Sequence, residues 1–139
     1  MTRSPRMIAA LAAGLLPSAA FAAACPGRSF EAFLTAFGRS AQVQRAHVAD
    51  PLLSGSIDAD AEPEPRMVKR KVSAASLAFP VMPLEARRRH DGLAMSKAAR
   101  SGGAVEVLLA KPDTGYQLRY LFRPTASCWT LTEMADESM

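Results

Sequence analysis

Apolar residues recur at helical spacing soon after the apolar start of the chain. Four of them share one predicted helical face, at intervals of three and four residues: Phe30, Phe33, Leu34 and Phe37. Ser29 is a suitable N-cap residue for this helix, and Gly38 is a natural end. Ser40 begins a second helical piece that runs through Val48 and ends before Pro51. The pattern therefore predicts an N-terminal helix with an aromatic core face.

The middle of the chain carries a mixed pattern. Residues 66–73 alternate basic and apolar side chains, which is typical of a half-exposed strand. Residues 77–82 form a short apolar run that is interrupted by Pro80 and followed by Pro83, either a strand or an irregular edge. Residues 83–100 predict two short helical pieces, because Pro83 suits a first helical position and Asp91-Gly92 interrupts the pattern.

The last third of the chain predicts three strands. Residues 104–110, 116–123 and 128–134 alternate apolar and polar side chains, and a turn sequence, Pro112-Asp113-Thr114-Gly115, separates the first two. Three such strands form an antiparallel meander with one buried face. Helices followed by strands indicate an α+β fold, in which the N-terminal helix packs on a curved antiparallel sheet that ends in the meander.

Residues 54–65 read SGSIDADAEPEP and predict a flexible acidic loop. Its four acidic residues alternate, but the central Gly and closing Glu of a calcium loop are missing. We therefore interpret this segment as solvated and as a part of one small domain, residues 23–139.

The first 22 residues have the layout of a secretory signal peptide. Arg3 and Arg6 form a basic head, residues 7–16 are apolar, and Ala20-Phe21-Ala22 is a small-residue exit. The apolar stretch is too short for a membrane span, which needs about 20 residues, and no later stretch is long enough. Cleavage leaves about 117 residues with a net charge of about +2, because both arginines leave and all 13 acidic residues stay. We expect an exported, periplasmic or secreted protein without nucleic-acid partners or a transmembrane segment.

Two cysteines, Cys25 and Cys128, remain in the mature chain. In an oxidising compartment an even pair predicts a disulfide, here closing a loop of about 100 residues. Two alternatives stay open. In the first, Cys25 is the acylated cysteine of a bacterial lipoprotein, although Ala22 stands where such sites usually have Leu, and Cys128 is then unpaired. In the second, both cysteines are free thiols.

Candidate chemistry is sparse. The densest charge cluster, Arg87-Arg88-Arg89-His90, is either a solvated helix face or a site for an anionic component of the envelope, such as a lipid headgroup. Tyr116 and Tyr120 share one face of a predicted strand, so we interpret them as core or pocket-lining residues. No nucleophile elbow, phosphate loop or zinc-ligand spacing is present, and we expect no metal and no cofactor.

Both ends of the chain resemble an uncharacterised secreted bacterial family, domain of unknown function 4348. The N-terminal part of the resemblance is Phe30-x-x-Phe33-x-x-x-Phe37, Ser40, Val43-Gln44-Arg45 and Pro51-Leu52. The C-terminal part is Val105-Glu106-Val107, Gly115-Tyr116, Tyr120-x-Phe122, Trp129-x-Leu131 and Asp136-x-Ser138. Residues 54–100 depart from the family and look shortened. The resemblance implies a cone-like, nuclear-transport-factor-2-like α+β fold and no known activity.

The sequence thus predicts an exported binding or envelope-associated module without catalysis. Two alternatives remain: a small enzyme of the same fold with an acid or base in a pocket, and a lipid-anchored envelope subunit. Because this fold hosts both enzymes and binding modules, the fold alone does not choose between them.

Overall fold

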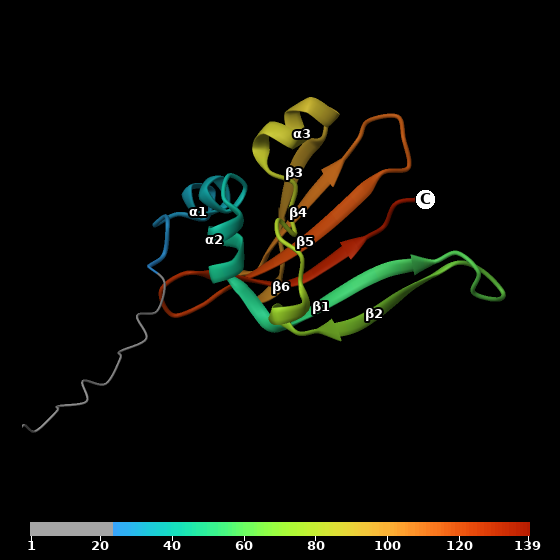
Figure 1. Cartoon of the computed structure of the whole chain (residues 1–139), viewed down its shortest axis with the longest axis horizontal. Coiled ribbons are helices and arrows are strands. Elements are labelled where there is room, and N and C mark those ends of the chain that lie inside the picture. The colour runs from blue at the N-terminus through green and yellow to red at the C-terminus, as the bar shows by residue number, and fades with distance from the viewer. Residues whose placement is uncertain (1–23) are drawn as a thin grey trace, which may run out of the picture.

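The computed structural model describes residues 24–139, so the predicted signal peptide, residues 1–22, lies outside the described part. The first elements are α1 (Phe30–Phe37), α2 (Ala41–Ala46), β1 (Val48–Asp58) and β2 (Arg66–Val72) (Figure 1). A short 3₁₀ turn η1 (Ala74–Ser76) and a helix α3 (Glu85–Asp91) follow. The chain continues with β3 (Ala94–Ala99), the turn η2 (Ser101–Gly103), β4 (Val105–Ala110), β5 (Gln117–Pro124) and β6 (Trp129–Asp136).

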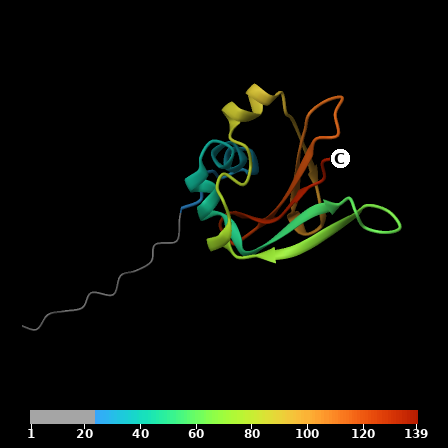
Figure 2. The ribbon, with the colours of Figure 1, turned by 45° about the vertical axis from the view of Figure 1, so that its right-hand side comes forward.

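The strands form one six-stranded sheet in the order β2-β1-β6-β5-β4-β3. The sheet is strongly curved, and Figures 1 and 2 show the helices gathered on one side of it, while the β1–β2 hairpin projects away from them. The described chain is therefore α+β with a curved sheet, as the sequence predicts. We call the face toward the helices the inner face and the opposite face the outer face.

One pairing differs from the predicted antiparallel sheet. β1 and β6 run parallel, with Ser54 beside Met134 and Ser56 beside Asp136. The other four pairings are antiparallel. β1 follows directly from α2 and therefore enters the sheet from the same end as β6. A pairing between segments so far apart in sequence leaves no mark on local alternation, and for that reason the pattern could not predict it.

The second helix is shorter than predicted. It ends at Ala46, and Val48 already belongs to β1, which continues through Pro51 and on to Asp58. The loop is consequently shorter than the predicted segment 54–65. Residues 54–58 lie in β1, and only residues 59–65 connect β1 to β2. Ser, Gly and Asp are weak strand formers, but backbone pairing with β2 on one side and β6 on the other overrides that preference.

The second helical piece predicted after Gly92 is wrong. Gly92 ends α3 in a left-handed conformation with φ 69°, and residues 94–99 then form β3 at the edge of the sheet. β3 pairs only with β4, and its alanines show no clear period. Alanine favours helices, so local propensity indicated the wrong element and pairing with β4 decided the outcome.

One end of the sheet is filled by aromatic side chains, and we call it the closed end. Phe33, Phe37 and Phe122 are fully buried, and their ring centroids lie 5.0–5.8 Å apart. Ser29 accepts a hydrogen bond from the Ala32 amide and so begins α1 where its aromatic stripe meets the sheet. Phe30 and Trp129 extend this cluster toward the disulfide.

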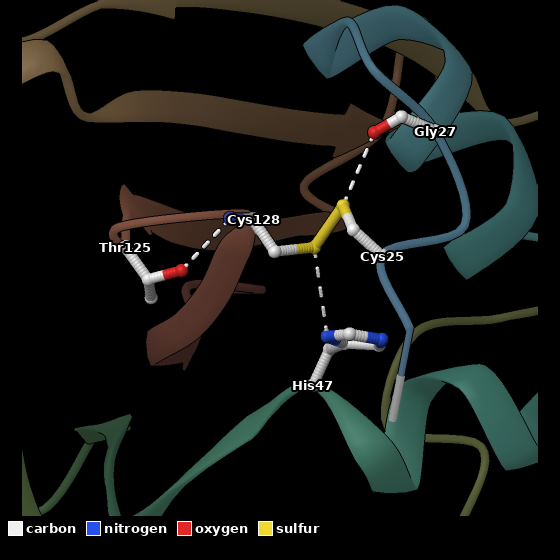
Figure 3. Close-up of a disulfide and its surroundings, with 5 residues drawn as sticks. All are labelled: Cys25, Gly27, His47, Thr125 and Cys128. Atoms are coloured by element: carbon white, nitrogen blue, oxygen red, sulfur yellow. Dashed lines mark hydrogen bonds between the residues drawn. A yellow bond between two sulfur atoms is a disulfide. The ribbon is translucent and has the colours of Figure 1, made fainter. Parts of the chain in front are cut away.

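The disulfide between Cys25 and Cys128 joins the segment before α1 to the start of β6 (Figure 3). The two Cα atoms are 5.4 Å apart and the cysteines are 103 positions apart in sequence. The His47 ring is buried beside the bridge, with Nδ1 3.8 Å from the Cys128 sulfur, and it meets the Phe33 ring edge-on. The predicted disulfide is therefore present, and it covers the aromatic cluster.

Candidate functional site

A cavity of about 400 Å³ lies at the other, open end, between the inner face of the sheet and residues 77–84. We call residues 77–84 the strap. Apolar side chains form most of the wall: Pro80, Val81, Pro83, Leu118 and Met134. Ser54, Arg87, Tyr120 and Asp136 supply the polar groups. A cavity of this size with few polar groups is typical of a site for a small ligand.

The sheet positions its share of the wall through register. Tyr120 on β5 lies opposite Met134 on β6, and Leu118 lies opposite Asp136. Because side chains alternate between the faces of a strand, these four project toward the helices and the strap. Ser54 on β1 lies beside Met134 and completes this floor.

A buried amide holds the strap in place. Gln44 on α2 is fully buried, and its Nε2 donates to the carbonyl oxygens of Phe37 and Met82, at 3.0 and 2.9 Å. Its Oε1 accepts from the Met82 amide at 3.0 Å. One side chain thereby satisfies three buried backbone groups and ties the strap to the end of α1. Met82 itself is fully buried in the core.

Tyr120 fixes the strap from the opposite side. Its hydroxyl donates to the Val81 carbonyl oxygen at 3.1 Å, one residue before the position that Gln44 holds. The ring is 2% exposed, and burial, followed by the nearby Tyr116 and Asp136, raises the pKa of the phenol well above its usual value. At neutral pH Tyr120 is therefore a neutral hydrogen-bond donor whose proton is already engaged.

Charged groups lie only at the rim of the cavity. Arg87 on α3 donates from Nε to Asp91 Oδ2 at 2.6 Å, and its side chain is 70% exposed. Asp136, at the end of β6, accepts from the Ser138 amide at 3.0 Å. The cavity thus presents an apolar interior with one donor group and one acceptor group at its mouth.

The two tyrosines singled out in the sequence have different surroundings. Tyr120 lines the cavity, whereas Tyr116 lies before β5, is 38% exposed, and lines two other cavities near the β4–β5 turn. Partial burial raises the pKa of Tyr116. Strand alternation placed both on one face, but β5 begins only at Gln117, so Tyr116 lies outside the sheet.

The structure divides the run at residues 87–90. Arg87 and His90 both contact Asp91, and Arg89 pairs with Glu85 at 2.7 Å. Hydrogen bonds from His90 and Arg87 lower the pKa of the Asp91 carboxyl, so that side chain stays ionised. Three of the four side chains of this run therefore contact a carboxylate on their own helix.

Arg88 points the other way, into the space between α1, α3 and β3. Its Nη1 lies 3.6 Å from the Met95 sulfur, and its buried Nε has no hydrogen-bond partner among residues 24–139. Burial lowers the pKa of the Arg88 guanidinium. The four residues do not converge on one site, and anion binding by this run stays a prediction.

Other expectations concern metals and membranes. No group of three or more His, Cys, Asp or Glu side chains within residues 24–139 is arranged to hold a metal ion. No helix in the described range is long and apolar enough to cross a bilayer.

Sequence reasoning missed Gln44 and the strap. No local signal marked Gln44, because α1 ends at Phe37 and α2 begins at Ala41, so the period of one helix does not fix the face of the other. A glutamine at a core position needs partners, but the pattern does not say which backbone groups they are. Those groups belong to a segment 38 residues away, which adopts no regular structure around Met82.

Comparisons with known proteins identify the fold of the chain but no family. No family model matches the chain, and no curated protein matches it. The resemblance to domain of unknown function 4348 therefore stays a prediction.

Among solved structures, the chain is similar to the crystal structure of an ntf2-like protein from Bacteroides fragilis NCTC 9343. The TM-score is 0.56 and the identity is 16%, over 79% of this chain and 47% of that one. The chain thus spans about half the length of that protein. At this identity the likeness shows the fold alone, and the fold is nuclear-transport-factor-2-like.

Proposed function

We propose that this protein is an exported binding module that holds a small, mainly apolar ligand in the cavity under the strap. The observation that supports this most directly is the wall itself, which is apolar and is held open by Gln44 and Tyr120. The cone-like arrangement of the mature domain, residues 23–139, shapes the space. In it the N-terminal helix covers one end of the sheet, and β5 and β6 of the meander form the floor of the other together with β1.

Export is part of the proposal. The signal-like start and the Cys25–Cys128 disulfide both fit an oxidising compartment, the periplasm or the exterior. The disulfide also bears on the lipid-anchored alternative. A sulfur bonded to Cys128 has no thiol left to carry an acyl chain, so acylation of Cys25 requires the bridge to be absent.

The enzyme alternative needs a group in the cavity that exchanges a proton near neutral pH. Tyr120 does not meet this need, because burial raises the pKa of its phenol and the proton is donated to the Val81 carbonyl. Tyr120 is therefore unsuited to that role, and the apolar wall of the cavity supports binding.

A pair of leucines on β5 allows a matched test. Leu118 lines the cavity on the inner face, whereas Leu121 lies on the outer face, and both are half-buried. The neutral apolar fluorophore Nile red should bind the wild-type protein with enhanced emission. Leu118→Trp, which fills the cavity, should abolish that emission, and Leu121→Trp should leave it unchanged.

Thermal unfolding of both variants shows whether the exchange has perturbed the fold. Equal emission from Leu118→Trp and the wild type, with both folded, would contradict binding under the strap. Loss of emission in both variants alike would contradict it as well, because the dye would then report the outer face or a general loosening.

A further inference from the structure

A second cavity, of about 230 Å³, lies on the outer face of the sheet. Four cationic residues line it: Lys69, Arg100, Arg119 and Arg123. Two carboxylates, Glu106 and Glu133, complete the charged wall, and Leu121 and Ala135 provide an apolar floor. The helices lie on the other side of the sheet, so none of them covers this face (Figure 2).

The fold assembles this cavity from separate parts of the chain. In the sheet, Lys69 on β2 lies opposite Gly55 on β1, and Gly55 lies beside Ala135 on β6. Ala135 in turn lies opposite Arg119 on β5. Gly55 has no room for a larger side chain, because a Cβ there would lie 2.9 Å from the Met67 sulfur and 3.2 Å from the Ala135 Cβ. Lys69 and Arg119 therefore flank a row of small residues.

The carboxylates hold the cationic groups around the floor. Glu106 receives two hydrogen bonds from Arg100, at 2.7 and 3.4 Å, and lies 4.0 Å from Arg119. Glu133 pairs with Lys69 at 2.5 Å. The glutamate side chains are 19–20% exposed and those of their cationic partners are 38–50% exposed, so the positive ends reach further toward solvent.

The positive charges outnumber the negative ones. Glu137 pairs with Arg119 from outside the cavity and adds a third carboxylate. Arg123 takes part in none of the ion pairs within 4.0 Å among the described residues, and its guanidinium lies near Gly102 in η2. A ladder of surface ion pairs would balance its charges, whereas this arrangement leaves one arginine uncompensated.

We propose that the outer-face cavity binds a tetrahedral oxyanion of the phosphate or sulfate type, carried by a small organic molecule. Arg123 supplies the uncompensated charge, Arg100 and Arg119 add guanidinium donors, and the Leu121 floor contacts the organic part. Cationic groups that approach from several strands suit an anion whose acceptor oxygens point in several directions.

The run at residues 87–90 differs from this site in geometry. Its members are consecutive on α3, where Glu85 and Asp91 contact three of them and Arg88 points elsewhere. On the outer face the cationic residues are up to 54 positions apart and converge on one cavity. The site lies on the opposite face from the strap cavity and does not depend on it.

Calorimetry at low ionic strength tests the proposal with inorganic phosphate, glucose 6-phosphate and glucose. Both phosphates should bind, and glucose should not. Arg123→Gln should weaken phosphate binding about tenfold or more, because it removes a charge-assisted donor. Glu133→Gln should strengthen binding, since it removes a competing carboxylate. Arg28→Gln changes the net charge equally at an exposed position outside the cavity and should have no effect.

Several results would overturn the proposal. They are the absence of phosphate binding to the folded wild type, equal affinity of Arg123→Gln and Arg28→Gln, and weaker binding by Glu133→Gln. Vesicles that contain phosphatidylglycerol form a separate arm. Binding to them without binding of either small phosphate would assign this face to a membrane surface instead.

Discussion

The two ends of the sheet are made by the same strands and serve different purposes. At the closed end Phe33, Phe37 and Phe122 fill the space between sheet and helix, and the Cys25–Cys128 bridge covers them. At the open end the strap stands away from β5 and β6 and leaves a cavity. The two ends differ in the side chains that face inward, aromatic rings at the closed end and Leu118, Met134 and Tyr120 at the open end.

This difference separates stability from binding. Burying an aromatic side chain contributes several kcal/mol, so the closed end carries much of the folding free energy. The open end lacks that packing, and hydrogen bonds from Gln44 and Tyr120 define the shape of the cavity in which we propose that a ligand binds. Substitutions at the two ends should therefore have distinguishable consequences.

The largest effect is expected at the centre of the closed end. Phe33→Ala should lower the free energy of unfolding by about 4 kcal/mol, because it removes a fully buried ring that contacts five other rings. Urea denaturation followed by far-UV circular dichroism measures the loss. Val68→Ala, at a site that is 43% exposed, should change the stability by less than about 0.5 kcal/mol. Similar losses in the two variants would remove the distinction between the closed end and the exposed hairpin.

The disulfide should have the next largest effect. Replacing Cys25 and Cys128 together by Ser should cost about 3 kcal/mol, because the bridge restricts a long loop in the unfolded chain. At a temperature where the variant is folded, Nile red should still bind, since the bridge is at the closed end. A variant that stays folded but no longer binds the dye would show that the two ends are coupled.

Gln44 links the two ends, so its substitution should affect both properties. Gln44→Ala leaves three buried backbone groups without their partner and should cost about 2 kcal/mol. It should also weaken dye binding, because the strap loses its attachment. Gln42→Ala, at an exposed site on the same helix, is the matched control and should change neither property. Unaltered dye binding by a folded Gln44→Ala variant would show that the strap does not need this clamp.

The sequence predicted the closed end better than the open end. The aromatic stripe of α1, the alternation in β4 to β6 and the cysteine pair are local patterns, and each indicated a feature that the structure contains. The open end depends on long-range placement. The parallel pairing of β1 with β6, and the strap held by Gln44, join segments that have no common local signal. The cationic outer-face cavity was hidden for the same reason, whereas the run at residues 87–90 was conspicuous because its members are consecutive in the sequence.

The smallest effect concerns the tyrosine that holds the strap, and its signature is a dependence on pH. At pH 7 Tyr120→Phe should cost about 1 kcal/mol, the usual contribution of one hydrogen bond. Burial raises the pKa of Tyr120 in the folded protein, while the phenol in the unfolded chain ionises near its ordinary pKa of about 10. As the pH rises past about 10, the unfolded state loses this proton and the folded state keeps it, so the stability of the wild type should fall.

Tyr120→Phe has no such proton to lose, so its stability should fall less steeply above about pH 10, and the difference from the wild type should shrink. Tyr116→Phe is the control. Tyr116 is 38% exposed, so its removal should leave most of the wild-type slope in place. Chemical denaturation at a series of pH values from 8 to 11 measures the three slopes. Parallel curves for Tyr120→Phe and the wild type would mean that the phenol at the strap ionises as readily in the folded protein as in the unfolded chain. That result would place water, and not the Val81 carbonyl, beside the hydroxyl.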